Sequence, residues 1–109
     1  MPYGLTDQQL ERIRATLAAI PAIRQAVLFG SRAKGTHKPG SDIDLALKGP
    51  RLELNDSLTL ANRLEDLDLP YSFDLVVYHH IQDAPLIEHI DRIGKLLYQA
   101  EPMLSESVT

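Results

Sequence analysis

Apolar residues recur every three or four positions in three stretches of the chain, a spacing typical of amphipathic helices. These apolar residues are Leu10, Ile13, Leu17 and Ile20 in the first stretch, Leu60, Leu64 and Leu67 in the second, and Leu86, Ile90 and Ile93 in the third. Residues that favour helix starts precede the three stretches: a Thr6–Gln9 capping-box pattern, then Asn55 or Asp56, and then Asp83. The chain therefore predicts three helices, of which the first ends at Pro21 and the second spans about Asp56 to Leu67.

Short apolar runs between these stretches predict β-strands. The predicted strands are Ala26–Phe29, Asp42–Leu47, Phe73–Tyr78 and, as a short edge strand, Lys95–Tyr98. The edge strand is preferred to a longer last helix because Gly94 suits the position that follows a helix. Helices that alternate with strands indicate an α/β or α+β fold, with a small mixed sheet of three to four strands flanked by helices.

Composition limits the classes of protein to consider. The chain has 109 residues, of which 44% are hydrophobic, so we expect one globular domain over 1–100 and a polar, flexible tail over 101–109. A net charge of −4 argues against direct DNA binding, and the absence of cysteine excludes disulfides and thiolate metal sites. The start of the chain lacks a secretory signal pattern, and no apolar run is long enough for a membrane span. We expect a soluble, cytoplasmic protein.

The stretch that follows the first predicted strand has the features of an anion-binding turn. Gly30 and Ser31 come directly after that strand and should open a short helical turn. Glycine allows a ligand to approach the backbone, the free N–H groups of a helix start favour an anion, and the Ser31 hydroxyl adds a donor. Arg32 and Lys34 place positive charge nearby, and they are either phosphate ligands or solvated loop charges.

Three aspartates follow this turn on predicted strands. Asp42 and Asp44 are two residues apart, so both side chains leave the same face of a strand, with Cα atoms about 7 Å apart. Asp74 begins the next strand, and it completes a cluster of three acids if the two strands are neighbours. Carboxylates without His or Cys favour Mg²⁺ or Mn²⁺, and three of them suit a two-metal transfer of a phosphoryl-type group.

The histidines are weaker candidates. His79 and His80 are not expected to bind a metal together, because adjacent side chains on extended chain point to opposite sides. His89 falls on the predicted outer face of the last helix, where we expect it to be solvated, and His37 should be a surface residue. Tyr3 and Tyr71 have no predicted role. The leucines of the second helix belong either to the core or to a partner surface.

These motifs resemble the minimal nucleotidyltransferases of the polymerase-beta superfamily. The hallmark of that family is Gly-Ser, a spacer, Asp-x-Asp and a later third acid, found here as Gly30-Ser31, Asp42-x-Asp44 and Asp74. The resemblance extends from Leu10 to about Tyr98, and it implies the nucleotidyltransferase fold.

The resemblance also implies an activity. It implies an ATP triphosphate bound at Gly30 and Ser31, two Mg²⁺ ions held by Asp42, Asp44 and Asp74, and transfer of AMP to a hydroxyl. Because minimal members are similar to antitoxins of helical HEPN-type toxins, the implied acceptor is a tyrosine of such a toxin. A non-catalytic protein that neutralises a toxin by binding it, and a transferase for a small molecule such as an aminoglycoside, are the alternatives.

Overall fold

A computed structural model describes residues 2–101 of the chain. Along the chain the elements are the short 3-10 turn η1 (Pro2–Gly4), α1 (Asp7–Ala18), β1 (Gln25–Phe29), α2 (Gly30–Lys34), β2 (Ile43–Lys48), α3 (Leu54–Glu65), β3 (Phe73–Val77), the 3-10 turn η2 (Tyr78–His80), α4 (Ala84–Ile93) and β4 (Lys95–Gln99). All but the first residue of the predicted C-terminal tail lies outside this range. None of the helices within 2–101 has the length and apolar character that a bilayer span requires.

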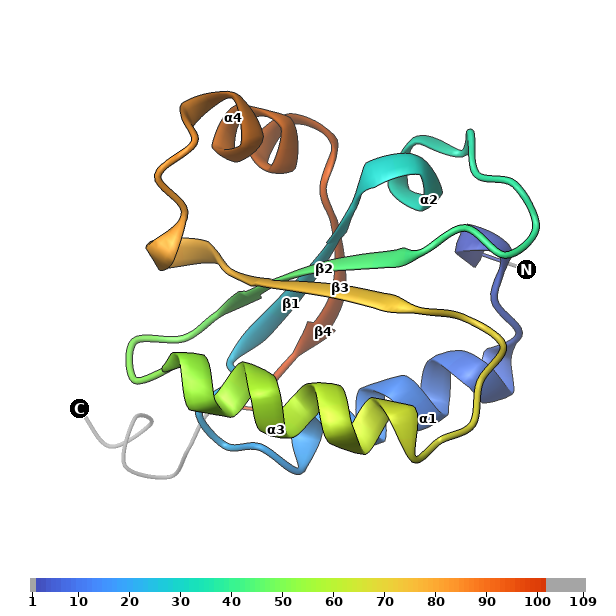
Figure 1. The fold of residues 1–109 in the computed structure, drawn as a ribbon, viewed down its shortest axis with the longest axis horizontal. Coiled ribbons are helices and arrows are strands. Elements are labelled where there is room, and N and C mark those ends of the chain that lie inside the picture. The colour runs from blue at the N-terminus through green and yellow to red at the C-terminus, as the bar shows by residue number, and fades with distance from the viewer. Residues whose placement is uncertain (1, 102–109) are drawn as a thin grey trace.

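The four strands form one mixed sheet in the order β3-β2-β1-β4. β1 is antiparallel to both β2 and β4, whereas β2 and β3 are parallel. The parallel pair is possible because α3 carries the chain back across one face of the sheet between β2 and β3 (Figure 1). The predicted mixed sheet, flanked by helices and with an edge strand at Lys95, is confirmed.

The helices cover the two faces of the sheet unequally. α1 and α3 lie together across one face, and the short α2 and α4 lie on the other (Figure 1). The main core fills the space under α1 and α3, and its largest fully buried side chains are Leu5, Ile13, Leu17, Ile23, Leu28, Ile43, Leu45, Leu47, Leu60 and Leu64. A smaller cluster on the other face centres on Phe29, Ala46 and Ile90.

Local signals predict the starts of α1 and of α4, where Asp83 is the N-cap as expected, but not the start of α3. The predicted capping box of α1 is present, since Thr6 Oγ1 accepts from the Gln9 N–H at 3.1 Å. α3 begins two residues before the predicted start, so neither Asn55 nor Asp56 is its cap. Glu53 is the N-cap, and its N–H donates to Oδ2 of Asp56 at 2.9 Å. Asp56 is therefore the third residue of this helix, where a carboxylate can bond back to the cap.

Gly94 ends α4 for a different reason from the one expected. Its φ of −58° and ψ of 144° are open to any residue, so no left-handed turn is needed. A Cβ at this position would collide with the Ile90 carbonyl oxygen and with Cγ1 of Val27 on β1. Glycine is therefore required here for the close passage of the backbone from α4 into β4.

Candidate active site

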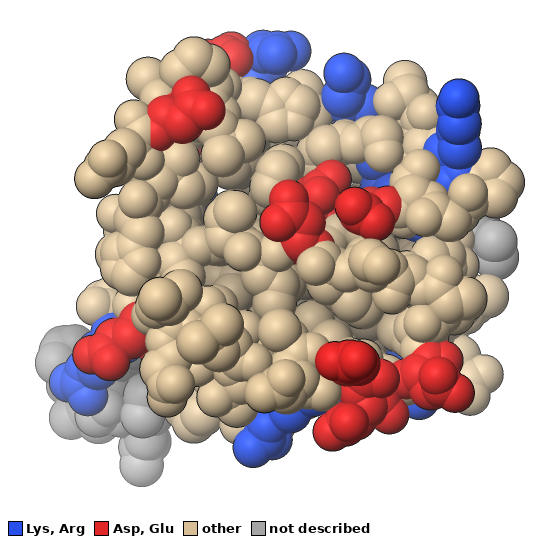
Figure 2. All heavy atoms as spheres, viewed as in Figure 1, with Lys and Arg blue, Asp and Glu red and all other residues tan. Residues whose placement is uncertain are grey.

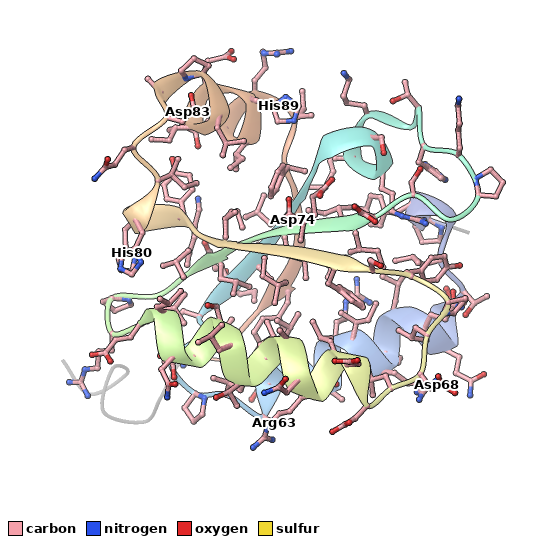
Figure 3. The ribbon with its side chains drawn as sticks, viewed as in Figure 1. Arg63, Asp68, Asp74, His80, Asp83 and His89 are labelled. Carbon is pink, nitrogen blue, oxygen red and sulfur yellow. The ribbon has the colours of Figure 1, made fainter. Side chains whose placement is uncertain are left out.

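The candidate site lies on the sheet face that α2 and α4 only partly cover. Side chains alternate along β2, so Ile43 and Leu45 point into the main core while Asp44 points to the opposite face. Asp74 of β3 is the register partner of Asp44 across the parallel pair. Figure 3 shows Asp74 near the middle of this view, and Figure 2 shows a group of acidic side chains there. The alternation of two residues thus brings acids from adjacent strands to one face.

The three aspartates differ in their exposure. Asp74 is exposed, Asp42 is exposed and directly precedes β2, and Asp44 is half-buried. Burial raises the pKa of the Asp44 carboxyl, and the nearby Asp74 and Asp42 carboxylates raise it further; Arg32 opposes them, and the pKa of Asp44 reaches about 6. Asp44 is therefore close enough to Asp74 and to Asp42 to be repelled by both, and a bound cation would relieve that repulsion.

Gly30 makes room for the half-buried acid. It directly follows β1 and begins α2 with a φ of +74°, in the left-handed region that favours glycine. A Cβ at this position would collide with Oδ2 of Asp44. The Gly-Ser turn and the Asp-x-Asp motif, which are separate in sequence, are therefore in direct contact, and glycine is required for that contact.

The amide of Gly30 is already engaged. Its N–H donates to Nε2 of His89 at 3.3 Å, and the His89 ring packs edge-on against Phe29 at 6.1 Å between centroids. His89 is half-buried between α4 and the β1–α2 junction, so the prediction of a solvated histidine is wrong. The sequence held a signal for this, because His89 follows Leu86 by three residues and precedes Ile93 by four, which places it on their face of the helix.

Arg32 is buried within this site and holds main-chain groups in place. It is 2% exposed, so it is not a solvated loop charge. Its guanidinium donates to the Ser41 carbonyl from Nε and Nη2, at 3.1 and 2.8 Å, and to the Tyr3 carbonyl from Nη1 at 2.8 Å. It also lies 4.6 Å from the centre of the Tyr71 ring. Arg32 thus fixes the residue that directly precedes Asp42. Lys34, at the end of α2, is exposed.

Tyr3 and Tyr71 were missed by sequence reasoning because their partner is distant along the chain. His37, predicted to be a surface residue, is also half-buried. His79 and His80 lie in the turn η2 with ring centroids 4.5 Å apart, so they do not point to opposite sides as extended residues would. The short turn after β3 brings the two rings together.

The side chains at this site are of a type that binds metal ions, but they do not form a preformed metal site. Within residues 2–101, no three His, Cys, Asp or Glu side chains converge on a common point as metal ligands. The carboxylate oxygens of Asp44 and of the two acids that repel it are nevertheless suitable donors for a hard divalent cation. Such a cation would be held by Asp44 with Asp42 or Asp74, and ligand oxygens and water would complete its coordination.

Comparisons with known proteins agree with this geometry. A sequence profile described as "Polymerase beta, Nucleotidyltransferase" matches residues 11–102. Among curated proteins, none matches at a significant level.

Several solved structures are similar to the chain. A toxin–antitoxin crystal structure with AMP-PNP has a chain that is 26% identical, with a TM-score of 0.68 over 91% of this chain and 78% of that one. The toxin–antitoxin MntA-HepT has one that is 26% identical, with a TM-score of 0.64 over 87% and 74%. A structure of the tri-AMPylated HEPN toxin of Shewanella oneidensis with its MNT antitoxin is 22% identical, with a TM-score of 0.50 over 86% and 69%, which shows the fold alone.

The profile covers most of the first helix, the Gly-Ser turn, all three aspartates and the last strand. The predicted resemblance and the predicted class of enzyme are therefore confirmed. The chain belongs to the polymerase beta nucleotidyltransferase family.

Proposed function

We propose that this chain is a Mg²⁺-dependent nucleotidyltransferase that moves AMP from ATP to a hydroxyl group, with residues 1–100 as its catalytic domain. The observation that carries the proposal is the pairing of Asp44 with Asp74 beside Gly30 on the open face of the sheet. Acids held together against their own repulsion are unfavourable for folding alone, and they become useful when a cation and a triphosphate bind. Mn²⁺ is an alternative ion with the same oxygen ligands.

The residues of the site suit distinct parts of the reaction. In this proposal the Ser31 hydroxyl, on the first turn of α2, donates to a phosphate oxygen, and exposed Lys34 supplies positive charge at the end of that helix. Arg32 contributes by bracing the loop before Asp42. Mg²⁺ bound by the aspartates would neutralise charge on the phosphates and on the attacking and leaving oxygens.

Because Asp74 matches the third acid of the nucleotidyltransferase motif, we assign to it the role of helping to deprotonate the acceptor. It is exposed, so an incoming hydroxyl can reach its carboxylate, whereas Asp44 is half-buried against Gly30. The acceptor oxygen forms a bond to the α-phosphorus, the bond from that phosphorus to the bridging oxygen breaks, and pyrophosphate leaves. The hydroxyl proton passes to the carboxylate, so the reaction transfers one AMP without any change in oxidation state.

The proposed acceptor is a tyrosine of a HEPN-type toxin, and the proposed role of the chain is that of a cytoplasmic antitoxin. This proposal is supported by the similarity to chains of toxin–antitoxin structures, one of them with AMP-PNP, at 26% identity. It is also supported by the exposure of Asp42 and Asp74, because a protein acceptor needs an open site.

The test is a transfer assay with ATP labelled on the α-phosphate. The chain is expressed with its neighbouring gene, the co-purified pair is incubated with labelled ATP and Mg²⁺, and the acceptor residue is mapped by mass spectrometry. We expect the label on a tyrosine of the partner, and its loss with EDTA or in an Asp42→Asn, Asp44→Asn double variant. No label on a partner that remains bound would contradict the proposal and favour neutralisation by binding.

A further inference from the structure

His89 joins two parts of the molecule that are far apart in sequence. It projects from the side of α4 that is turned toward α2, and its Nε2 accepts the N–H of Gly30, 59 residues away in sequence (Figure 3). α4 packs against both β1 and α2, so the histidine lies where these elements meet. His89 itself lies outside the Gly-Ser and Asp-x-Asp motifs that define the proposed site, although its partner Gly30 belongs to the first of them.

The contact has a definite chemical requirement. Nε2 can accept a hydrogen bond only when it carries no hydrogen, so the neutral ring must carry its proton on Nδ1. The edge of the ring packs against Phe29, with an interplanar angle of 85°, which limits its rotation. The position therefore needs a side chain of defined length that ends in an acceptor, and apolar packing alone does not meet this need.

The contact also reaches the acids. Gly30 is held on its amide side by His89, and on its Cα side it lies against the carboxylate of Asp44, where a Cβ would collide with Oδ2. A displacement of Gly30 would therefore disturb its bond to His89, its contact with Asp44, or both. The two contacts together fix how far the start of α2 stands from Asp44.

We propose that His89 is a positioning residue for nucleotide binding, which holds the Gly30 amide so that the start of α2 and the Asp44 carboxylate keep the separation that a triphosphate with its cation requires. The proposal rests on the proposed function for its ligand. It assigns phosphate contact to Ser31 and the amides that follow, because the Gly30 N–H is already bonded to the histidine.

The test compares side chains that differ in their acceptor. His89→Gln keeps an oxygen at about the reach of Nε2, and His89→Leu keeps bulk without an acceptor. Glu88→Gln, an exposed neighbour on the same helix, is the control. Each ¹⁵N-labelled variant is titrated with AMP-PNP and Mg²⁺ by calorimetry, and the hydrogen exchange rate of the Gly30 amide is measured by NMR without nucleotide.

We expect His89→Leu to weaken AMP-PNP binding about tenfold, the usual scale for losing one hydrogen bond, and to speed Gly30 exchange. His89→Gln should recover most of both effects, and Glu88→Gln should match the parent. In the transfer assay, the Leu variant should raise KM for ATP more than it lowers kcat. If the Leu variant does not fold, His89→Asn replaces it, because the asparagine side chain is too short for its oxygen to reach the Gly30 amide.

Given a parent chain that binds AMP-PNP, any of three results overturns the proposal. The first is a Leu variant with the same affinity for AMP-PNP as the parent, and the second is a Gln variant with an affinity as low as that of the Leu variant. The third is a Gly30 exchange rate that is the same in all variants. A parent chain that binds no AMP-PNP contradicts the proposed function instead. In that case the Gly30 exchange rates still decide whether His89 holds the β1–α2 junction.

Discussion

The two faces of the sheet place very different demands on the same strands. On β2, Ile43, Leu45 and Leu47 are fully buried under α1 and α3, whereas Asp44, between two of them, is half-buried on the opposite face among other acids. β3 has the same two-sided pattern, since Leu75 packs on the main core while the adjacent Asp74 is exposed on the opposite face. One strand thus contributes to stability on one side and to the site on the other.

The two faces contribute to the free energy of folding with opposite signs. The packed face buries continuous apolar surface, which stabilises the fold at about 25 cal/mol per Å² of apolar area. The open face holds Asp44 close to two other carboxylates, whose repulsion opposes folding. Substitutions on the packed face should therefore affect stability, and substitutions on the open face should affect function.

The largest expected effect is on activity, from Asp44→Asn on the open face. We expect the rate of AMP transfer to fall roughly a thousandfold or more, since the loss of charge at a metal site removes several kcal/mol of stabilisation. Stability should not fall, because the substitution removes repulsion from Asp74 and Asp42. The measurements are single-turnover labelling and urea unfolding of the same samples.

Asp68→Asn is the matched control for charge, because Asp68 is exposed and lies outside the site, and its φ of 56° suits asparagine. An Asp44→Asn variant that transfers AMP at the parent rate would contradict the claim that the open face carries the function.

The largest effect on stability should come from the packed face of the same strand. Leu47→Ala should lower the free energy of unfolding by about 2–5 kcal/mol, because it removes buried methyl groups and leaves a cavity. Leu58→Ala, whose side chain is 55% exposed, should change it by less than about 0.5 kcal/mol. Transfer per folded molecule should remain at the parent level in both, and a tenfold loss in either would show that the two faces are not independent.

Alanine substitutions at two glycines on the open face distinguish the effect of backbone strain from the effect of a collision with Asp44. Gly30 and Gly35 have φ values of +74° and +78°, so alanine at either should cost about 1–2 kcal/mol of stability. A Cβ has free space at Gly35 but collides with Asp44 at Gly30. Only Gly30→Ala should therefore abolish AMP-PNP binding in calorimetry, and equal loss in the two variants would contradict the assigned contact.

The smallest expected effect is a pH dependence of stability. The pKa of Asp44 is raised to about 6 in the folded chain, so the folded state binds this proton more tightly than the unfolded state does. The resulting stabilisation is present below about pH 4 and is lost as the pH rises through about 6. Solvent screening should limit it to about 1 kcal/mol, because Asp44 is only half-buried.

Chemical unfolding in EDTA at several pH values, with Asp44→Asn as the reference, would measure this effect. A difference between the two proteins that does not change with pH would contradict the repulsion described here.

Much of this division was open to prediction from sequence because it depends on local periods. Alternation along 42–47 placed Asp42 and Asp44 on one face, and the Thr6 capping box fixed the start of α1. The contacts of Arg32 and His89 could not be predicted in the same way, because their partners are main-chain groups of distant residues. Gly94 was interpreted as a helix cap, and only the packed structure reveals its close approach to β1.

The most direct test of the proposed active site is a crystal structure with AMP-PNP and Mn²⁺, whose anomalous scattering locates the metal. We expect a metal bound by Asp44 together with Asp42 or Asp74, and phosphates beside Ser31 and the start of α2. Nucleotide bound elsewhere, or a metal that makes no contact with these aspartates, would contradict the claim that the open face of the sheet is the active site.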